Sequence, residues 1–313
     1  MAQVIIGIDP HKGSHTALAL DEGEGKLGQL RVIAAPGQVD QLQRWAASWP
    51  ERVWAIEGAR GLGQLLAQQL IGAGERVMDV QPKLAARVRL LNTGQVNKND
   101  PNDARSVAVA ALRTHSAVDL LEEDVASVLK LWSRRYHDLG GLRTQLVCRL
   151  HAVLCELVPG GFARRISATQ AIGVLDSITA HGAVAAAKLE LARELVADLQ
   201  RIDGQRLEVK RRLAKAVAAT NTTVTEIHGV GPIIAAAVLG YAGDIRRFAN
   251  REHFASYNGT APIEASSGNR NIHRLSRRGT ASSTTPSTWP PSSRSATLAP
   301  MVGSTTTANE PKA

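Results

Sequence analysis

Short β-type runs alternate with helical stretches through the first 80 residues. The β-type runs predict strands at Val4 to Asp9, His15 to Leu20, Leu30 to Ala35, Val53 to Glu57 and Arg76 to Val80. Helical periodicity predicts helices over residues 39–48 and 61–73. A three-strand meander followed by alternating strands and helices is typical of an α/β domain with a mixed sheet covered by helices.

The pattern changes to long helices after Asp103. Apolar residues recur every seven positions in two stretches, which are Trp132, Leu139, Leu146 and Val153, and then Leu195, Ile202, Val209 and Ala216. These seams predict two long helices that form a coiled-coil hairpin or meet a second copy of the chain. The residues between them, around 159–177, predict a break with a short helix at most.

A glycine-containing turn opens a third region near Thr223. Residues 227–234 read Ile-His-Gly-Val-Gly-Pro-Ile-Ile, and an apolar helix is predicted to follow. Gly229 and Gly231 can leave backbone N–H groups free at the helix start, where a phosphate would bind. A plain connector has the same pattern, so both interpretations stay open. The chain therefore divides into residues 1–120, 121–222, 223–279 and a tail, 280–313.

Composition narrows the class of protein. With 313 residues, 44% of them hydrophobic and 21% charged, the chain is long enough for two folded domains. No apolar run approaches the roughly 20 residues of a membrane span, and residues 1–14 lack the order of a secretory signal, so we expect a cytoplasmic protein without a membrane partner. The net charge of +9 favours nucleic acid as a partner, although a merely basic surface would have the same balance.

Four carboxylates stand at positions that suit a site. Asp9 and Glu57 each end an apolar strand, so both emerge at one end of the sheet if the strands are neighbours. Asp100 and Asp103 begin a predicted helix, with Asp100 placed to cap it and Pro101 at its first position. Their spacing of three brings the two side chains near one another. For any single acid, a helix cap or a solvated charge is the ordinary explanation.

The four acids together favour a metal site. Phosphodiester hydrolysis or transfer commonly uses two Mg²⁺ ions about 4 Å apart, which need carboxylate oxygens from several chain segments. A DNA substrate would also explain a basic protein with an acidic site. The sequence therefore predicts an Mg²⁺-binding nuclease centre at Asp9, Glu57, Asp100 and Asp103.

Several blocks resemble one known family over residues 3–279. They are Gly7-Ile-Asp-Pro-His-Lys, Ala55-Ile-Glu-Gly-Ala, Lys98-Asn-Asp-Pro-Asn-Asp-Ala-Arg, Gly229-Val-Gly-Pro, Phe254-Ala-Ser-Tyr-Asn-Gly-Thr-Ala-Pro, Ser266-Ser-Gly and Arg274-Leu-Ser-Arg-Arg-Gly. In these the chain resembles the DEDD transposases of the IS110 insertion-sequence type. The resemblance implies a ribonuclease H-like, Holliday-resolvase-like first domain that holds Mg²⁺. It further implies a coiled coil used in assembly and a small helical C-terminal transposase domain with a helix-hairpin-helix-like turn.

The resemblance also implies a nucleophilic serine, a structured guide RNA that pairs donor and target DNA, and a homo-oligomer. Matching motifs place the serine at Ser267, directly before Gly268, with Ser266 as the close alternative. A serine hydroxyl needs a base or metal for activation, which carboxylate-bound Mg²⁺ could supply. A basic run beside it suits DNA phosphates, as would a solvated loop; its arginines are Arg270, Arg274, Arg277 and Arg278.

The tail departs from the family. Of the last 34 residues, 15 are Ser or Thr and five are Pro, without apolar periodicity, which predicts disorder. We interpret this tail as the family's helical ending translated out of frame after Gly279, and expect this copy to be impaired in strand exchange. A structure-specific DNA resolvase or nuclease, and an inactive nucleic-acid-binding remnant, are the alternative functions.

Overall fold

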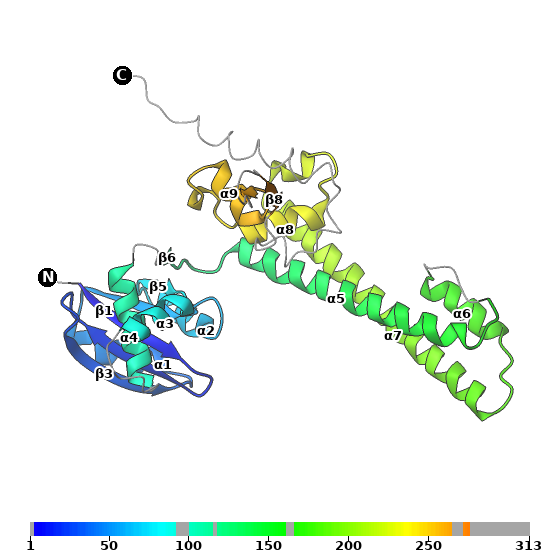
Figure 1. Ribbon diagram of the computed structural model, residues 1–313, viewed down its shortest axis with the longest axis horizontal. Helices are drawn as coiled ribbons and strands as arrows, with labels where there is room; N and C mark the ends of the chain where they lie inside the picture. The colour runs from blue at the N-terminus through cyan, green and yellow to red at the C-terminus, as the bar shows by residue number, and fades with distance from the viewer. Residues whose placement is uncertain (1–2, 92–99, 115–117, 161–165, 265–271, 276–313) are drawn as a thin grey trace, which may run out of the picture. The chain divides into compact units, whose positions relative to one another are not determined.

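The computed structural model describes residues 3–91, 100–114, 118–160, 166–264 and 272–275 (Figure 1). The chain divides into two compact units, Met1–Glu123 and a second that begins at Asp124. Ser266, Ser267, Arg270, Arg277 and Arg278 lie outside the described residues, as does the tail. Within the described parts, none of the helices combines the length and the apolar character that a membrane crossing requires.

A six-stranded mixed sheet forms the centre of the first unit, with the strand order β3-β2-β1-β4-β5-β6. The strands are β1 (Val4–Pro10), β2 (Ser14–Leu20), β3 (Lys26–Ile33), β4 (Arg52–Glu57), β5 (Val77–Val80) and β6 (Val118–Asp119). β1, β2 and β3 form an antiparallel meander, while β4 pairs parallel with both β1 and β5. The predicted mixed sheet with helices is confirmed, and its order agrees with the ribonuclease H-like expectation.

Helices cover both faces of this sheet (Figure 1). On one face lie α1 (Gln38–Trp45), the short 3-10 helix η1 (Ala46–Ser48) and α2 (Gln64–Gly72), packed over a core that includes Ile6, Ile8, Trp54 and Ile56. On the other face lie α3 (Pro82–Leu91) and α4 (Asp100–Arg113), packed over Ile5, Val53 and Ala55. Because side chains alternate along a strand, Asp9 and Glu57 belong to the face that α3 and α4 cover.

Long helices dominate the second unit. Its elements are α5 (Val125–Cys155), α6 (Ala168–Ser177), α7 (Ala183–Ala218), η2 (Thr223–Glu226), α8 (Pro232–Ala242), η3 (Ile245–Arg247), α9 (Arg251–Asn258), and the strands β7 (Pro262–Glu264) and β8 (His273–Leu275). The side chain of Asp124 accepts a hydrogen bond from the backbone N–H of Ser127 and so caps α5. Ser167 and Gln170 form a reciprocal capping box at the start of α6.

The apolar heptads of α5 and α7 face each other within one chain. Leu129 and Leu139 of α5 share a core cluster with Leu213 of α7, whereas Leu150 shares another with Leu199. The start of α5 therefore lies beside the end of α7, and the two helices run antiparallel (Figure 1). This intrachain packing is the hairpin alternative of the sequence prediction.

Candidate metal centre of the first unit

Two parallel strands deliver the first two acids. β1 and β4 pair with Gly7 opposite Ala55 and Ile8 opposite Ile56. Asp9 and Glu57 are the next residues of the two strands, so they emerge at the same end and on the same face of the sheet. The structure thus brings these two carboxylates together as the sequence predicted.

Helix α4 brings Asp103 to the same place through a close contact with β1. A methyl group added at Gly7 would lie 2.2 Å from the carbonyl oxygen of Ala104 and 2.6 Å from the backbone nitrogen of Ala108. Only a residue without a side chain permits this approach. Gly7 precedes Asp9 by two positions on the same face, and Ala104 follows Asp103 directly, so the contact sets the separation of the two acids.

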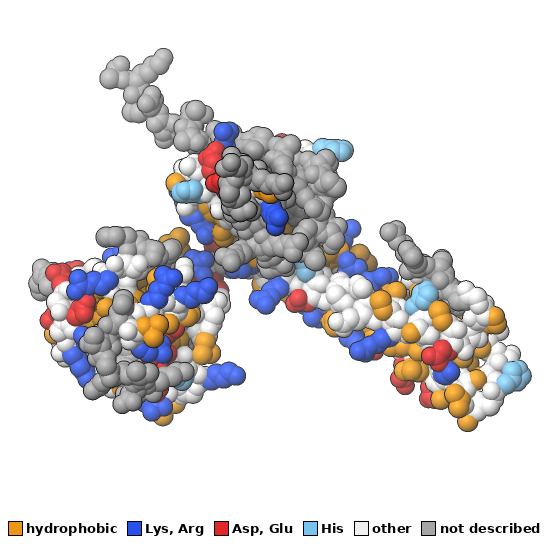
Figure 2. All heavy atoms as spheres, in the orientation of Figure 1, with side chains coloured by type: hydrophobic (Ala, Val, Ile, Leu, Met, Phe, Trp, Pro, Cys, Tyr) orange, Lys and Arg blue, Asp and Glu red, His pale blue; other side chains and the backbone are white. Residues whose placement is uncertain are grey.

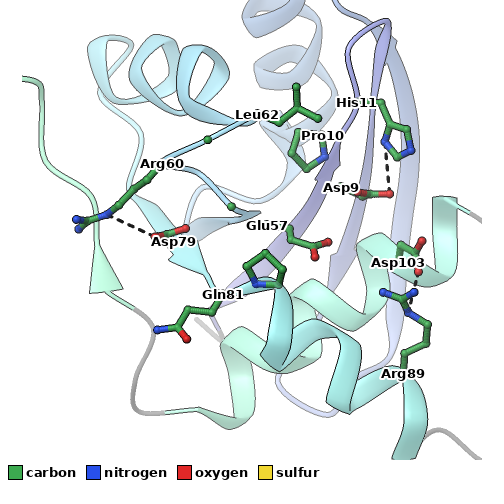
Figure 3. A pocket seen from close by; sticks show the side chains of 13 residues that line it. Asp9, Pro10, His11, Glu57, Arg60, Leu62, Asp79, Gln81, Arg89 and Asp103 are labelled. Atoms are coloured by element: carbon green, nitrogen blue, oxygen red, sulfur yellow. Dashed lines mark ion pairs between the residues drawn. The ribbon is translucent and has the colours of Figure 1, made fainter. Parts of the chain in front are cut away.

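Asp9, Glu57 and Asp103 line one pocket of about 590 Å³ (Figure 3). In the close view, the three carboxylates lie around a common space, with the Arg89 side chain from α3 beside Asp103. The other residues that line this pocket are Pro10, His11, Gly58, Arg60, Gly61, Leu62, Asp79, Gln81 and Pro82. A wide pocket that combines carboxylates with arginines suits a phosphodiester and a cation better than an apolar ligand.

The acids of this pocket are incompletely paired. Asp9 Oδ2 and Asp103 Oδ1 are buried without a hydrogen-bond partner. Asp9 Oδ2 lies 3.6 Å from His11 Nδ1, and Asp103 Oδ1 lies 3.0 Å from Arg89 Nε without hydrogen-bond geometry. Buried carboxylate oxygens without donors are unfavourable unless a cation compensates them.

Burial raises the pKa of both Asp9 and Glu57. For Asp9, the charges of Asp103 and Asp100 raise the pKa further, against a lowering influence of His11. For Glu57, the neighbouring charge of Asp9 adds to the effect of burial. Carboxylates that repel one another in a desolvated site favour protonation or a bound cation.

Glu75 in the same unit behaves in the opposite way. Burial raises its pKa, but hydrogen bonds from Arg52, Gln43 and Trp54 outweigh this and lower the pKa overall. Arg52 Nη2 lies 2.5 Å from Glu75 Oε1, and Trp54 Nε1 donates to Glu75 Oε2 at 2.7 Å. Glu75 is thus a satisfied structural acid, which separates it from the pocket acids.

The donor set fits a divalent cation. One ligand atom from each of Asp9, His11 and Asp100 lies within 4.8 Å of the other two. Glu57 and Asp103 line the pocket beside this group. Carboxylates are the ligands that Mg²⁺ prefers, and Asp9 has an unpartnered oxygen that could bind such an ion. Asp9, Glu57 and Asp103 thus share the pocket, and Asp100, which does not line it, lies near Asp9 and His11.

Family comparisons agree with this arrangement. A family model for IS110-type DEDD proteins, described as transposase, matches residues 6–159, and one described as the transposase IS116/IS110/IS902 family matches residues 221–283. Together they cover more than half of the chain. The chain belongs to the IS110 transposase family. The match over residues 6–159 includes all four acids of this transposase.

Three relatives are similar to the transposase over much of its length. The insertion element IS116 uncharacterized 44.8 kDa protein of Streptomyces clavuligerus is 24% identical, over 88% of this chain and 80% of that protein. A probable family 20 transposase of Pseudomonas aeruginosa is 27% identical, over 88% and 79%. The transposase for insertion sequence element IS1111A of Coxiella burnetii is 30% identical, over 58% and 51%.

Among solved structures, T. thermophilus RuvC in complex with a Holliday junction substrate is similar to the transposase. The match has 18% identity and a TM-score of 0.30, and covers 38% of this chain and 99% of that chain.

The structure adds residues to the site that sequence patterns did not single out. Asp79 of β5 accepts a hydrogen bond from the backbone N–H of Ala59 at 2.9 Å and lies 3.5 Å from Arg60 Nε (Figure 3). It thereby holds the turn that follows Glu57. His11 lies in the Asp-Pro-His block of the sequence, so a motif could have indicated it. Asp79 and Arg89 lie in no such motif.

In the second unit, the predicted glycine turn directly precedes a helix. Gly229 adopts a left-handed conformation with φ of 81°, and Gly231 directly precedes α8, whose first residue is Pro232. Arg274 lies exposed on β8, opposite Ile263 of β7. Phosphate binding by the glycine turn and by Arg274 stays a prediction.

Proposed function

We propose that this transposase cleaves and rejoins DNA strands to move an insertion sequence, with Mg²⁺ held by Asp9, Glu57, Asp100 and Asp103. The observation that carries this proposal is the buried, unpartnered oxygen of Asp9 in a pocket shared with Glu57 and Asp103. Family membership supplies the class of reaction, and the pocket supplies a place for it.

The chain's own side chains have separate tasks in this proposal. Asp9, Glu57 and Asp103 bind metal from a rigid sheet and helix, and Asp100 closes the site from the rim. Arg60 and Arg89, both in the pocket lining, can bind the non-reacting phosphate oxygens. Bound Mg²⁺ would make the attacking oxygen more nucleophilic and stabilise the charge on the leaving oxygen.

The second unit is proposed to contribute the nucleophile and the nucleic-acid contacts. Ser267, or Ser266 beside it, would attack the scissile phosphate, while a structured RNA pairs the element ends with the target. Arg270, Arg274, Arg277, Arg278 and the turn at Gly229 and Gly231 would bind phosphates. Lys and Arg side chains on the visible surface of both units are consistent with a polyanionic partner in the cytoplasm (Figure 2).

Two further parts of the proposal concern assembly and the tail. Copies of the transposase would assemble through the region of α5 and α7. The composition break after Gly279 supports a frame change that replaced the family's helical ending, so strand exchange by this copy should be weak. The nucleotide sequence around the Gly279 codon tests this directly, because codons that cannot be regrouped into a helical continuation would contradict it.

A comparison of two variants tests the proposed reaction. Full-length chain, Ser267→Ala and Glu57→Gln would be assayed with Mg²⁺ for cleavage and joining of labelled element ends in the presence of the element's RNA. We expect residual joining in the unaltered chain, and loss of about 100-fold or more in both variants. Cutting that Ser267→Ala retains but Glu57→Gln loses would favour a structure-specific resolvase. Nucleic-acid binding without any cutting would favour an inactive remnant.

A further inference from the structure

We propose that His11 is a metal ligand of this transposase, which completes a cation position with Asp9 and Asp100. The inference deepens the proposed function and rests on it. It assigns the position to divalent ions that accept an imidazole nitrogen as well as carboxylates, with Mn²⁺ as the representative ion.

The backbone fixes His11 at the edge of the site. β1 ends at Pro10, and the backbone N–H of His11 donates to the carbonyl oxygen of Ser14 at 3.0 Å, which closes the turn into β2. This turn holds the imidazole between the end of a strand and the start of a helix. His11 Nδ1 lies 3.6 Å from Asp9 Oδ2, and His11 Nε2 lies 3.9 Å from Asp100 Oδ1.

These separations are longer than those of hydrogen bonds. Only one ring nitrogen can bind the ion, and the 3.6 Å between His11 Nδ1 and Asp9 Oδ2 is close to the spacing of ligand atoms around one metal, since atoms that each lie about 2.1 Å from a metal are roughly 3 to 4.2 Å apart. Each of the three residues has a ligand atom within 4.8 Å of the other two, so a small side-chain movement would bring all three onto one ion. His11 is half exposed and therefore free to make that movement.

The buried Asp9 oxygen points to a ligand independently of this spacing. Asp9 Oδ2 has no hydrogen-bond partner, although the residue is only 7% exposed. The same oxygen is the Asp9 atom nearest to His11 Nδ1. A desolvated carboxylate oxygen is poorly compensated by a half-exposed ring at 3.6 Å, whereas an ion between the two would satisfy both.

A simpler role for His11 is that of a protonated counter-ion to the two acids. Among the described residues, the arginines paired with these acids are Arg31, 3.9 Å from Asp100, and Arg89, 3.0 Å from Asp103. A counter-ion competes with a bound metal, so its removal would increase metal affinity. A ligand contributes to metal affinity, so its removal would decrease it. The two roles therefore predict opposite changes in metal affinity when His11 is substituted.

Ligand chemistry also predicts which ion is affected most. Mg²⁺ binds oxygen and keeps several of its waters, whereas imidazole suits later divalent metals, and Mn²⁺ accepts both kinds of ligand. Loss of His11 should therefore weaken Mn²⁺ binding more than Mg²⁺ binding. The ratio of the Mn²⁺ affinity to the Mg²⁺ affinity then shows whether the ring nitrogen binds the metal. Asp9 contributes to both affinities.

The experiment measures binding of Mn²⁺ alone and Mg²⁺ alone to the full chain without DNA. Electron paramagnetic resonance follows free Mn²⁺, competition follows Mg²⁺, and spin-echo modulation detects nitrogen bound to Mn²⁺. His11→Ala and His11→Gln remove the ring, and His181→Ala removes an exposed histidine of the second unit as the matched control. Thermal denaturation checks that each variant is folded.

We expect imidazole nitrogen modulation in the unaltered chain and in His181→Ala, and its loss in both His11 variants. Mn²⁺ affinity should fall about tenfold or more in His11→Ala, with a change of less than about threefold for Mg²⁺. Tighter Mn²⁺ binding by His11→Ala, or nitrogen modulation that survives it, would overturn the assignment alone. If the unaltered chain binds neither ion, or if Asp9→Asn does not weaken the binding, both this assignment and the proposed carboxylate site would be overturned.

Discussion

The pocket carboxylates of the first unit differ from the ion-paired carboxylates on the long helices of the second unit. In the second unit, arginines lie 3.0 Å from Asp198, 2.6 Å from Asp203 and 3.0 Å from Glu208 in surface ion pairs. In the first unit, Asp9 keeps a buried oxygen without a hydrogen-bond partner, and burial raises the pKa of Asp9 and Glu57. The ion pairs of the second unit satisfy their carboxylates, whereas the pocket of the first unit leaves carboxylates desolvated and incompletely paired, which is unfavourable for the metal-free fold.

The largest expected effect separates these two kinds of acid by their response to metal. Saturating Mg²⁺ or Mn²⁺, at about 100 times the dissociation constant, should stabilise the first unit by about 2.7 kcal/mol. Asp9→Asn should abolish this gain, because it removes a shared ligand, while Asp203→Asn should keep it in full. Thermal melts with metal and with chelator measure the gain. If metal stabilises both variants equally, the proposed difference between the two kinds of carboxylate would be wrong.

Close glycine contacts test whether the site depends on one helix position. Gly7→Ala should displace α4 and destabilise the first unit by about 1–3 kcal/mol, with weaker metal binding. Gly240→Ala is matched in the second unit, where the added methyl would lie 2.5 Å from the backbone nitrogen of Lys130 in α5. It should destabilise that unit and leave metal affinity unchanged. Unfolding curves and Mn²⁺ titration measure the two effects; loss of affinity in Gly240→Ala would argue against separate units.

The smallest expected effect is a pH dependence of the metal-free chain. The ordinary pKa values are 3.8 for Asp9 and 4.5 for Glu57, and both are raised in the folded state. Their protonated forms therefore favour folding below those values, and this contribution is lost as pH rises through the raised pKa values.

Relative to the Asp9→Asn, Glu57→Gln double variant, the chelated unaltered chain should lose stability as pH rises above the ordinary pKa values of the two groups, 3.8 and 4.5. Denaturant unfolding at several pH values measures the difference between the two proteins. A difference that stays constant, or that favours the unaltered chain at higher pH, would contradict the raised pKa values.

Local patterns predicted most of the first unit because strands such as β1 and β4 stand out as short, β-type apolar runs between helical stretches. β1 and β4 end within one residue of the predicted positions, which placed Asp9 and Glu57 correctly. α3 was not predicted, since its sequence, Pro-Lys-Leu-Ala-Ala-Arg-Val-Arg-Leu-Leu, distributes cations among its apolar residues and buries little besides Ala85. β6 has two residues and carries no periodicity of its own.

The site was predictable where its residues share a motif, and not where distant segments meet. Asp100 and Asp103 lie in one block, so their proximity follows from helical spacing. Asp79 reaches the site because β5 pairs with β4, which sets it opposite Ile56, and Arg89 reaches it from α3. No local pattern encodes such cross-sheet neighbours, because they depend on the strand order.

The seam between α5 and α7 limits how the proposed contact between copies of the chain could form. Leu139 and Leu150 are fully buried between helices of the same chain, whereas Leu131, Leu142 and Leu207 stay exposed on the outer faces. A subunit contact made here must therefore use the outside of a closed hairpin. A synthetic peptide that copies the heptads would find the apolar seam of this hairpin already filled by its own partner helix.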